Sequence, residues 1–305
     1  MKKKLALLLA GVLCVASLTA CGGSTEEATT EVATEEATEE VEETVAQATG
    51  AITVITREDG SGTRGAFTEI TGVVDEDGND ITTVEASVQS STGGVMTGVA
   101  ADAQAIGYIS LGSLDDTVKA VTVEGVEATA ENILSGAYAV ARPFNIATLA
   151  GAELDPVAEE LLAFIFTQEA QDIVEAEGYI PVAVTTEEFT SEQPSGSITV
   201  GGSTSVYPLM EVIVEAYAVY NPNATINLEG VGSSAGMTGA LEGTFDIGMA
   251  SREMKDSELE SLDGYVMAQD GIAVIVNSAN PLDNLTLEQI MNIYTGTVTT
   301  YDELY

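Results

Sequence analysis

The chain contains no histidine and only two cysteines. Histidine is the usual general base of serine and cysteine hydrolases, and imidazole and thiolate are the usual zinc ligands. Cys14 falls within an N-terminal leader, so Cys21 is the only thiol left afterwards and no internal disulfide is expected. We therefore expect a protein that is not an enzyme and that uses no metal and no cofactor.

Positive charge is also scarce. The 305 residues include 9 Lys and Arg against 49 Asp and Glu, which gives a formal net charge of −40. Nucleic acids and anionic membrane surfaces are bound by clustered Lys and Arg, so we expect no nucleic-acid partner. A small anion needs only a few local donors, and the overall charge does not exclude one.

Residues 1–21 have the pattern of a secretory signal peptide: three lysines, an apolar run over 5–15, and a small-residue ending. The run is too short to span a membrane as a helix. The ending, Leu18-Thr19-Ala20-Cys21, resembles the lipobox of bacterial lipoproteins. That resemblance implies that Cys21 is lipidated and holds the protein at the cell membrane, the alternative being an ordinary signal with an incidental cysteine.

Residues 22–50 are rich in Glu, Thr and Ala and contain no aromatic residue. Nine glutamates repel one another there and leave little to bury, so we expect a disordered tether. Contact of these glutamates with calcium or with the cell wall is the alternative.

From residue 51 onward, short β-branched runs alternate with helical patterns. We expect strands at 52–56, 106–109, 198–200, 226–228 and 272–277, and helices from 64, over 156–176, over 206–220, from 234 and from 286. This alternation indicates an α/β fold with mainly parallel sheets. Residues 190–196 are polar and turn-rich, and we expect them to connect two blocks.

Three clusters of Gly, Ser and Thr each follow an expected strand and precede a helix: 57–64, 201–205 and 232–236. Free backbone N–H groups at a helix N-terminus, together with hydroxyls, form a site for a small oxyanion. Three of the six basic residues outside the leader, Arg57, Arg64 and Arg252, lie in or just after these clusters. The sequence therefore predicts an anion site where the clusters meet.

The same segments resemble a known family, the phosphate-binding lipoproteins of bacterial phosphate ABC transporters, a branch of the type II periplasmic binding proteins. The resemblance covers 51–305 and rests on the motifs Arg57-Glu58-Asp59-Gly60-Ser61-Gly62-Thr63-Arg64, Ala105-Ile106-Gly107-Tyr108, Glu177-Gly178-Tyr179-Ile180-Pro181, Gly202-Ser203-Thr204-Ser205-Val206-Tyr207-Pro208-Leu209, Gly232-Ser233-Ser234-Ala235-Gly236, Asp246-Ile247-Gly248-Met249-Ala250-Ser251-Arg252-Glu253 and Asp270-Gly271-Ile272-Ala273-Val274. It implies a two-lobed α/β fold of the type II periplasmic-binding-protein kind.

The order of the motifs differs from that family, because the usual second half here precedes the first. We interpret the chain as a circular permutant, with one lobe made of 51–136 plus 269–305 and the other of 137–268. The alternative is a truncated tandem array, which would contain an unpaired half-domain.

The resemblance also implies a site and partners. The implied phosphate ligands are Arg57, Ser61, Gly62, Thr63, Thr204, Ser205 and Ser233. Asp59 would orient Arg57, and Ser251, Arg252 and Arg64 are further candidates. The implied partners are inorganic phosphate and the permease subunits of an ABC transporter, and we expect an extracytoplasmic, lipid-anchored monomer.

One departure bears on specificity. Studied relatives place an aspartate, which accepts the proton of hydrogen phosphate, where this chain has Ser251-Arg252. Loss of that acceptor weakens the case for rejection of sulfate, the alternative being that Glu253, Asp246 or a backbone carbonyl takes its place. The alternative function is therefore a surface binding or sensing module for another oxyanion, such as sulfate, without a transport role. A serine-hydrolase elbow at Gly232-Ser233-Ser234-Ala235-Gly236 is the rival from a different class, and the absence of histidine argues against it.

Overall fold

The structure is a computed structural model that describes residues 47–185 and 188–305. The predicted signal peptide, Cys21 and the predicted tether up to residue 46 lie outside the described residues. None of the described helices is both long and apolar enough to cross a membrane.

One mixed sheet forms the frame of residues 47–305. Its strand order is β2 (Ser87–Gln89), β1 (Thr53–Arg57), β3 (Ala105–Ser110), β11 (Leu262–Asn277), β6 (Ala141–Leu149), β10 (Ile247–Ala250), β8 (Gly196–Gly202) and β9 (Ala224–Gly230). The three strands at each end pair in parallel, as predicted. Short strands β4 (Val118–Ala120) and β7 (Ile180–Pro181) also pair with β11, and β5 (Thr122–Val123) pairs with β12 (Asn284–Leu285).

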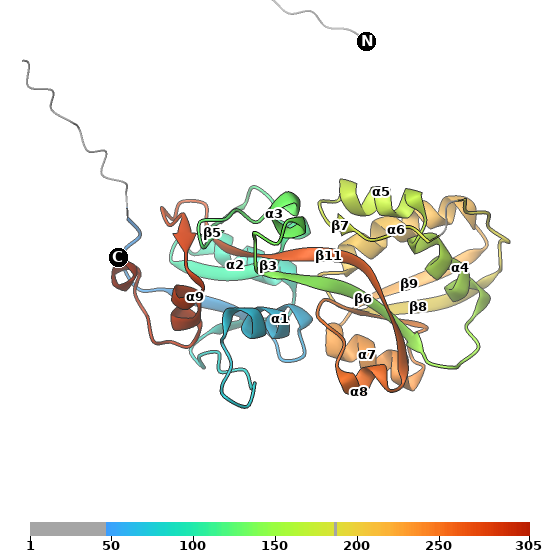
Figure 1. Cartoon of the computed structure of the whole chain (residues 1–305), viewed down its shortest axis with the longest axis horizontal. Coiled ribbons are helices and arrows are strands. Elements are labelled where there is room, and N and C mark those ends of the chain that lie inside the picture. Colours follow the sequence, from blue (N-terminus) through green and yellow to red (C-terminus); the bar gives the residue numbers. More distant parts are fainter. Residues whose placement is uncertain (1–46, 186–187) are drawn as a thin grey trace, which may run out of the picture. The chain divides into compact units, whose positions relative to one another are not determined.

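The middle of the sheet is antiparallel, which the sequence did not predict. β11 pairs with β3 through its second half and with β6 through its first half, and β6 pairs with β10. Figure 1 shows β6 and β11 running side by side between the two groups of parallel strands. The expected strand at 272–277 is therefore only the end of a 16-residue strand.

Helices cover both groups of strands (Figure 1). The first group carries α1 (Gly62–Thr71), α2 (Thr92–Ala101), α3 (Ala130–Leu134), α9 (Leu287–Tyr294) and the 3₁₀ turns η1 (Leu111–Ser113) and η2 (Tyr301–Leu304). The second carries α4 (Pro156–Ile165), α5 (Gln168–Ala176), α6 (Tyr207–Tyr220), α7 (Ser233–Glu242) and α8 (Asp256–Leu259).

The helix predicted over 156–176 is two helices. α4 ends at Ile165 and α5 begins at Gln168, because the Thr167 hydroxyl accepts a hydrogen bond from the Ala170 backbone N–H and caps the second helix. An N-cap threonine satisfies a backbone donor that has no partner inside the helix. The apolar period continues across this junction, which is why the pattern reads as one helix.

This cap gives a testable expectation for stability. Thr167→Ala removes the cap and should lower the free energy of unfolding by about 1 kcal/mol, measured by urea denaturation. Thr97→Ala is the control, because Thr97 is exposed in the middle of α2 and caps no helix. Equal effects of the two substitutions would contradict the capping role.

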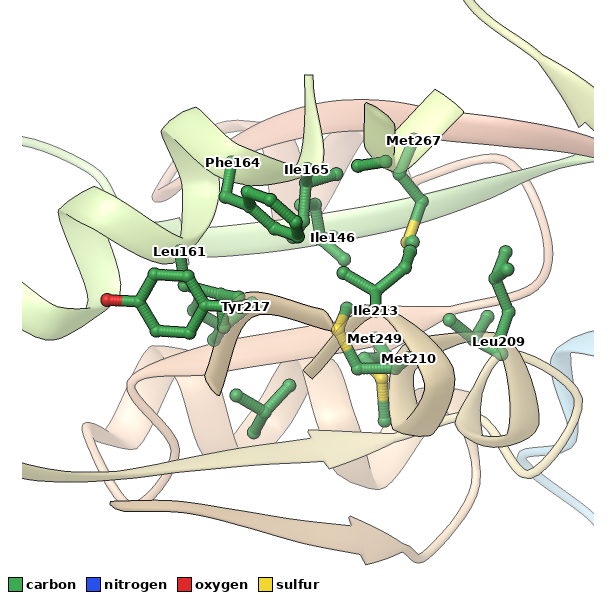
Figure 2. Close-up of a cluster of buried hydrophobic side chains, with 14 of the residues drawn as sticks. Ile146, Leu161, Phe164, Ile165, Leu209, Met210, Ile213, Tyr217, Met249 and Met267 are labelled. Carbon is green, nitrogen blue, oxygen red and sulfur yellow. The ribbon is translucent and has the colours of Figure 1, made fainter. Parts of the chain in front are cut away.

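Two large hydrophobic cores lie on either side of the antiparallel strands. One gathers buried side chains from residues 48–140 and 272–301, including Phe67, which stacks on Tyr108 with ring centroids 3.9 Å apart. The other gathers residues 144–268. Figure 2 shows part of it, where Leu161 and Phe164 of α4 meet Ile213 and Tyr217 of α6. The two cores correspond to the two expected lobes. We now propose that the boundary between the lobes lies at the start of β6, near residue 141, rather than at 137.

The two ends of the folded part lie together. Gly50 accepts a hydrogen bond from the Tyr301 backbone N–H (2.9 Å) and donates one to Asp302 (2.8 Å). Ala48 is buried and its N–H donates to the Tyr305 hydroxyl (3.1 Å), so the folded part begins within the segment 22–50 that was expected to be a tether. Adjacent ends are what a circular permutation requires, and we retain the permutation as our interpretation of the motif order.

Candidate functional site

The segments singled out in the sequence contact one another across the two lobes. Thr63, in the first turn of α1, lies 2.9 Å from Ser205, hydroxyl to hydroxyl. The Ser234 backbone N–H, in α7, donates to the Gly60 carbonyl at 3.0 Å. The loops after β1, β8 and β9 therefore meet at one place, with α1 and α7 beginning there.

Arg57 lies at the centre of this contact. Its side chain is 2% exposed, and it donates from Nη2 to Thr204 Oγ1 (2.9 Å) and from Nη1 to Thr92 Oγ1 (3.3 Å). The same guanidinium binds Glu58 through Nε and Nη2, each at 2.8 Å. A planar guanidinium suits such a paired carboxylate contact. Arg57 is thus fixed by a carboxylate on one side and by hydroxyls on the other.

The expectation that Asp59 orients Arg57 is wrong. Asp59 lies in the turn after β1 with its side chain 98% exposed, and its carboxylate pairs with Arg64 at 3.1 Å. Glu58 takes the expected role because it directly follows the strand and its longer side chain reaches back to the guanidinium.

Two further predicted cations are engaged by other partners. Arg64 pairs with Asp80 at 2.6 Å and donates to the Arg57 carbonyl at 2.9 Å. It therefore stabilises the backbone of the loop after β1. Arg252 gives both terminal nitrogens to Glu258, each at 2.8 Å. Burial alone would raise the pKa of Glu258, but the hydrogen bonds from Arg252 and from the Lys255 backbone outweigh it and lower that pKa. Arg252 therefore has a partner of its own.

Ser251, by contrast, lies with the predicted ligands. Its hydroxyl accepts from Ser203 Oγ at 2.8 Å, and its backbone N–H donates to Ser233 Oγ at 3.1 Å. Gly62 packs directly against this group, since a Cβ at Gly62 would lie 2.4 Å from Ser233 Oγ. The loop after β1 can approach α7 this closely only because residue 62 has no side chain. Ser61 caps α1 by accepting from the Arg64 backbone N–H at 3.4 Å.

We name the buried polar group formed in this way the hydroxyl cluster. Seven of its members are almost wholly shielded from solvent, namely Arg57, Thr63, Thr92, Ser203, Ser205, Ser233 and Ser251. The eighth, Thr204, is partly exposed. It unites all the predicted hydroxyl ligands except Ser61, which instead caps α1.

The sequence analysis missed Thr92. Its hydroxyl lies 3.0 Å from Ser205 Oγ. The signal was present, because residues 90–94 read Ser-Ser-Thr-Gly-Gly and follow a strand, but β2 is short and exposed and was not recognised as a strand.

The sequence indicated a structural role for Arg142 where the chain crosses between the lobes, but not its pairing with Asp270. Arg142 on β6 pairs with Asp270 on β11 at 3.1 Å, and both side chains are fully buried. Arg142 Nη1 also donates to the Ser251 carbonyl at 3.0 Å. Burial raises the pKa of Asp270 to about 6. β6 and β11 are the two strands that connect the lobes. The ion pair links these strands to each other, and through Ser251 it links them to the hydroxyl cluster.

The cluster is suited to binding a small anion. The charges of Arg57 and Arg142 are balanced by Glu58 and Asp270, so the remaining attraction comes from hydroxyls, N–H groups and helix N-termini. Such donors match a tetrahedral oxyanion, whose oxygens all accept hydrogen bonds. The chain has no histidine to act as a base toward any of these serines.

The chain is similar to known proteins over most of its length. The family model of the PBP superfamily domain matches residues 24–169 and 187–304. The chain is 44% identical over 260 residues to the phosphate-binding protein PstS 2 of Streptococcus pneumoniae serotype 4, covering 84% of this chain and 89% of that protein. It is 40% identical over 260 residues to the protein of the same name from Streptococcus agalactiae serotype V, covering 84% and 88%.

A solved structure is similar as well. It is the crystal structure of a phosphate ABC transporter, phosphate-binding protein from Streptococcus pneumoniae TIGR4, with a TM-score of 0.68 and 44% identity. The match covers 84% of this chain and 100% of that one.

Proposed function

Because the chain belongs to the PBP superfamily, and within it to the phosphate-binding proteins, we propose that it captures inorganic phosphate and delivers it to an ABC-type phosphate importer. The observation that carries this proposal is the hydroxyl cluster, in which Arg57, Thr63 and Thr92 of one lobe meet Thr204 and Ser205 of the other. An oxyanion bound there would take over donors that the hydroxyls otherwise share with one another.

The proposed ligands are those named from the sequence, namely Arg57, Ser61, Gly62, Thr63, Thr204, Ser205 and Ser233. Of the further candidates named from the sequence, we include Ser251, because it contacts Ser233 and Ser203. Arg64, Arg252 and Asp59 are proposed as supporting residues, because each is held in an ion pair outside the cluster. If each charge-assisted contact contributes about 1.5 to 3 kcal/mol, a handful suffices for micromolar binding, near −8 kcal/mol after ordering costs.

The partners follow from the same proposal. We propose an extracytoplasmic monomer that is held at the cell membrane by lipid on Cys21 and that meets the permease subunits of the importer. The leader sequence and the names of the relatives support this placement. No catalytic step is proposed, since a protein that releases its ligand unchanged needs neither a nucleophile nor a base.

Calorimetric titration of the protein with phosphate, arsenate and sulfate tests the function. Phosphate and arsenate should bind with similar affinity, because both are tetrahedral and protonated near neutral pH. A protein that gives no heat with any of the three anions would disprove the proposal.

Ser251 is the residue that favours the alternative function, binding of another oxyanion without transport. A hydroxyl can accept a hydrogen bond as well as donate one, but it rejects an unprotonated oxygen far less strongly than a carboxylate does. We expect Ser251→Asp to weaken sulfate binding by about tenfold or more while phosphate binding changes less, as measured by competition against phosphate. If sulfate binds more tightly than phosphate to the unmodified protein, the alternative replaces the main proposal.

A further inference from the structure

Thr92 occupies a special position in the hydroxyl cluster, because it links the guanidinium to the hydroxyls of the other lobe. It is the first residue of α2, whose N-cap Ser91 accepts from the Gly94 backbone N–H at 3.0 Å. The Thr92 side chain is 4% exposed. Its Oγ1 lies 3.3 Å from Arg57 Nη1 and 3.0 Å from Ser205 Oγ.

The chemistry of these partners gives the hydrogen bonds a direction. A guanidinium can only donate, so Thr92 Oγ1 accepts from Arg57 and its own proton is free to point at Ser205 Oγ. Ser205 Oγ then has its proton available for Thr63 Oγ1, 2.9 Å away. Within the described residues Thr63 makes no other side-chain hydrogen bond, so the donor at the end of this series is the Thr63 hydroxyl.

A second series runs through the other lobe. Ser203 Oγ accepts from the backbone N–H groups of Ser205 (3.1 Å) and Val206 (3.3 Å), which directs its proton to Ser251 Oγ at 2.8 Å. Ser251 Oγ lies 3.4 Å from Ser233 Oγ. Both series thus lead to hydroxyls in the first turns of helices, Thr63 in α1 and Ser233 in α7.

We propose that Thr92 is a further binding residue for the oxyanion. Because Thr92 must accept from Arg57, its own hydroxyl donates to Ser205, and the Ser205 hydroxyl in turn donates to Thr63; Thr92 thereby orients the hydroxyl donors. This inference rests on the proposed function. Without the Thr92 hydroxyl, Arg57 Nη1 loses its acceptor and the Ser205 proton loses its fixed direction. The anion then meets hydroxyls whose protons are no longer arranged toward it, and binding weakens although Arg57 and its charge remain.

The test compares variants of two threonines on the same helix. Thr92→Val removes the hydroxyl but keeps the shape, and Thr92→Ser keeps the hydroxyl. Thr97→Val is the matched control, because Thr97 is exposed and, among residues 47–185 and 188–305, its hydroxyl binds only the Gly93 carbonyl of its own helix. Phosphate affinity is measured by calorimetry for all variants, and thermal unfolding without phosphate shows whether each is folded.

We expect Thr92→Val to weaken phosphate binding by about tenfold or more, the value of one buried hydrogen bond, while Thr92→Ser stays within about threefold and Thr97→Val is unchanged. If Thr92→Val does not fold, Thr92→Ala provides the same comparison with Thr92→Ser. Unchanged affinity in the folded variant without the hydroxyl overturns the inference but leaves the proposed function intact. Equal losses in Thr92→Val and Thr92→Ser also overturn it, since packing would then be the cause. An unmodified protein that fails to bind phosphate removes the proposed function itself.

Discussion

Replacing Arg57 by alanine should weaken phosphate binding from about the micromolar to about the millimolar range. The substitution removes the only guanidinium in the hydroxyl cluster, together with its contacts to Thr204 and Thr92. It also leaves the Glu58 carboxylate without the partner that both its oxygens now bind, so a negative charge would face the incoming anion. Two lost charge-assisted hydrogen bonds and this repulsion together cost about 4 kcal/mol or more, which is a loss of about a thousandfold in affinity.

Two companion variants make this measurement specific. Arg57→Lys keeps the charge but cannot bind Glu58 and the two threonines together, so its affinity should lie between those of the unmodified protein and Arg57→Ala. Lys119→Ala changes the net charge by the same amount at a surface pair with Asp283, and it should bind phosphate normally. Calorimetry with all three decides the matter: near-normal affinity in Arg57→Ala would mean that the anion binds elsewhere.

The second large effect concerns stability. Arg142→Met should lower the free energy of unfolding by about 3 to 5 kcal/mol at pH 8, because it leaves the Asp270 carboxylate buried without its partner. Replacing both residues by apolar ones, Arg142→Met with Asp270→Leu, should recover much of that loss, since no charge is then left without compensation. Urea denaturation of the two variants and the unmodified protein measures both differences.

The same variant should be sensitive to pH in a defined direction. Burial already raises the pKa of Asp270 to about 6 in the presence of Arg142, and removal of the positive charge can only raise it further. A group whose pKa is higher in the folded state stabilises that state when protonated, and this contribution is lost as the pH rises through the folded-state value. The loss caused by Arg142→Met should therefore be smaller at pH 5 than at pH 8, and a loss independent of pH would contradict the role given to Asp270.

The sequence pointed to most residues of the candidate site but not to all of them. The three clusters were recognisable because Gly, Ser and Thr between a strand and a helix, with arginines in or near them, are typical of an anion-binding loop. Thr92 escaped because β2 has only three residues and its side chains are largely exposed, so no strand pattern preceded its cluster. Glu58 and Asp59 are adjacent carboxylates, and only the backbone turn after β1 determines which of them reaches Arg57.

The sequence predicted the elements that depend on a local pattern of apolar residues, and it did not predict the strand pairing between residues far apart in the chain. The parallel strands at both ends of the sheet follow β-branched runs, as expected. β6 and β11 escaped recognition as connecting strands because pairing such as that of Asp270 with Arg142 joins residues far apart in the chain. The helix over 156–176 was drawn as one element because Thr167, which interrupts it, sits within an unbroken apolar stripe.

In the part of the chain that the structure describes, the backbone passes between the two cores only at the start of β6 and in the middle of β11. Residues 141–268 are thus an insertion in the remainder of the domain, attached through two neighbouring strands that are hydrogen-bonded to each other. A pair of strands joined in this way bends far more readily than it stretches or slides. Any opening of the hydroxyl cluster would accordingly be a hinge motion that bends β6 and β11 where they cross between the two cores.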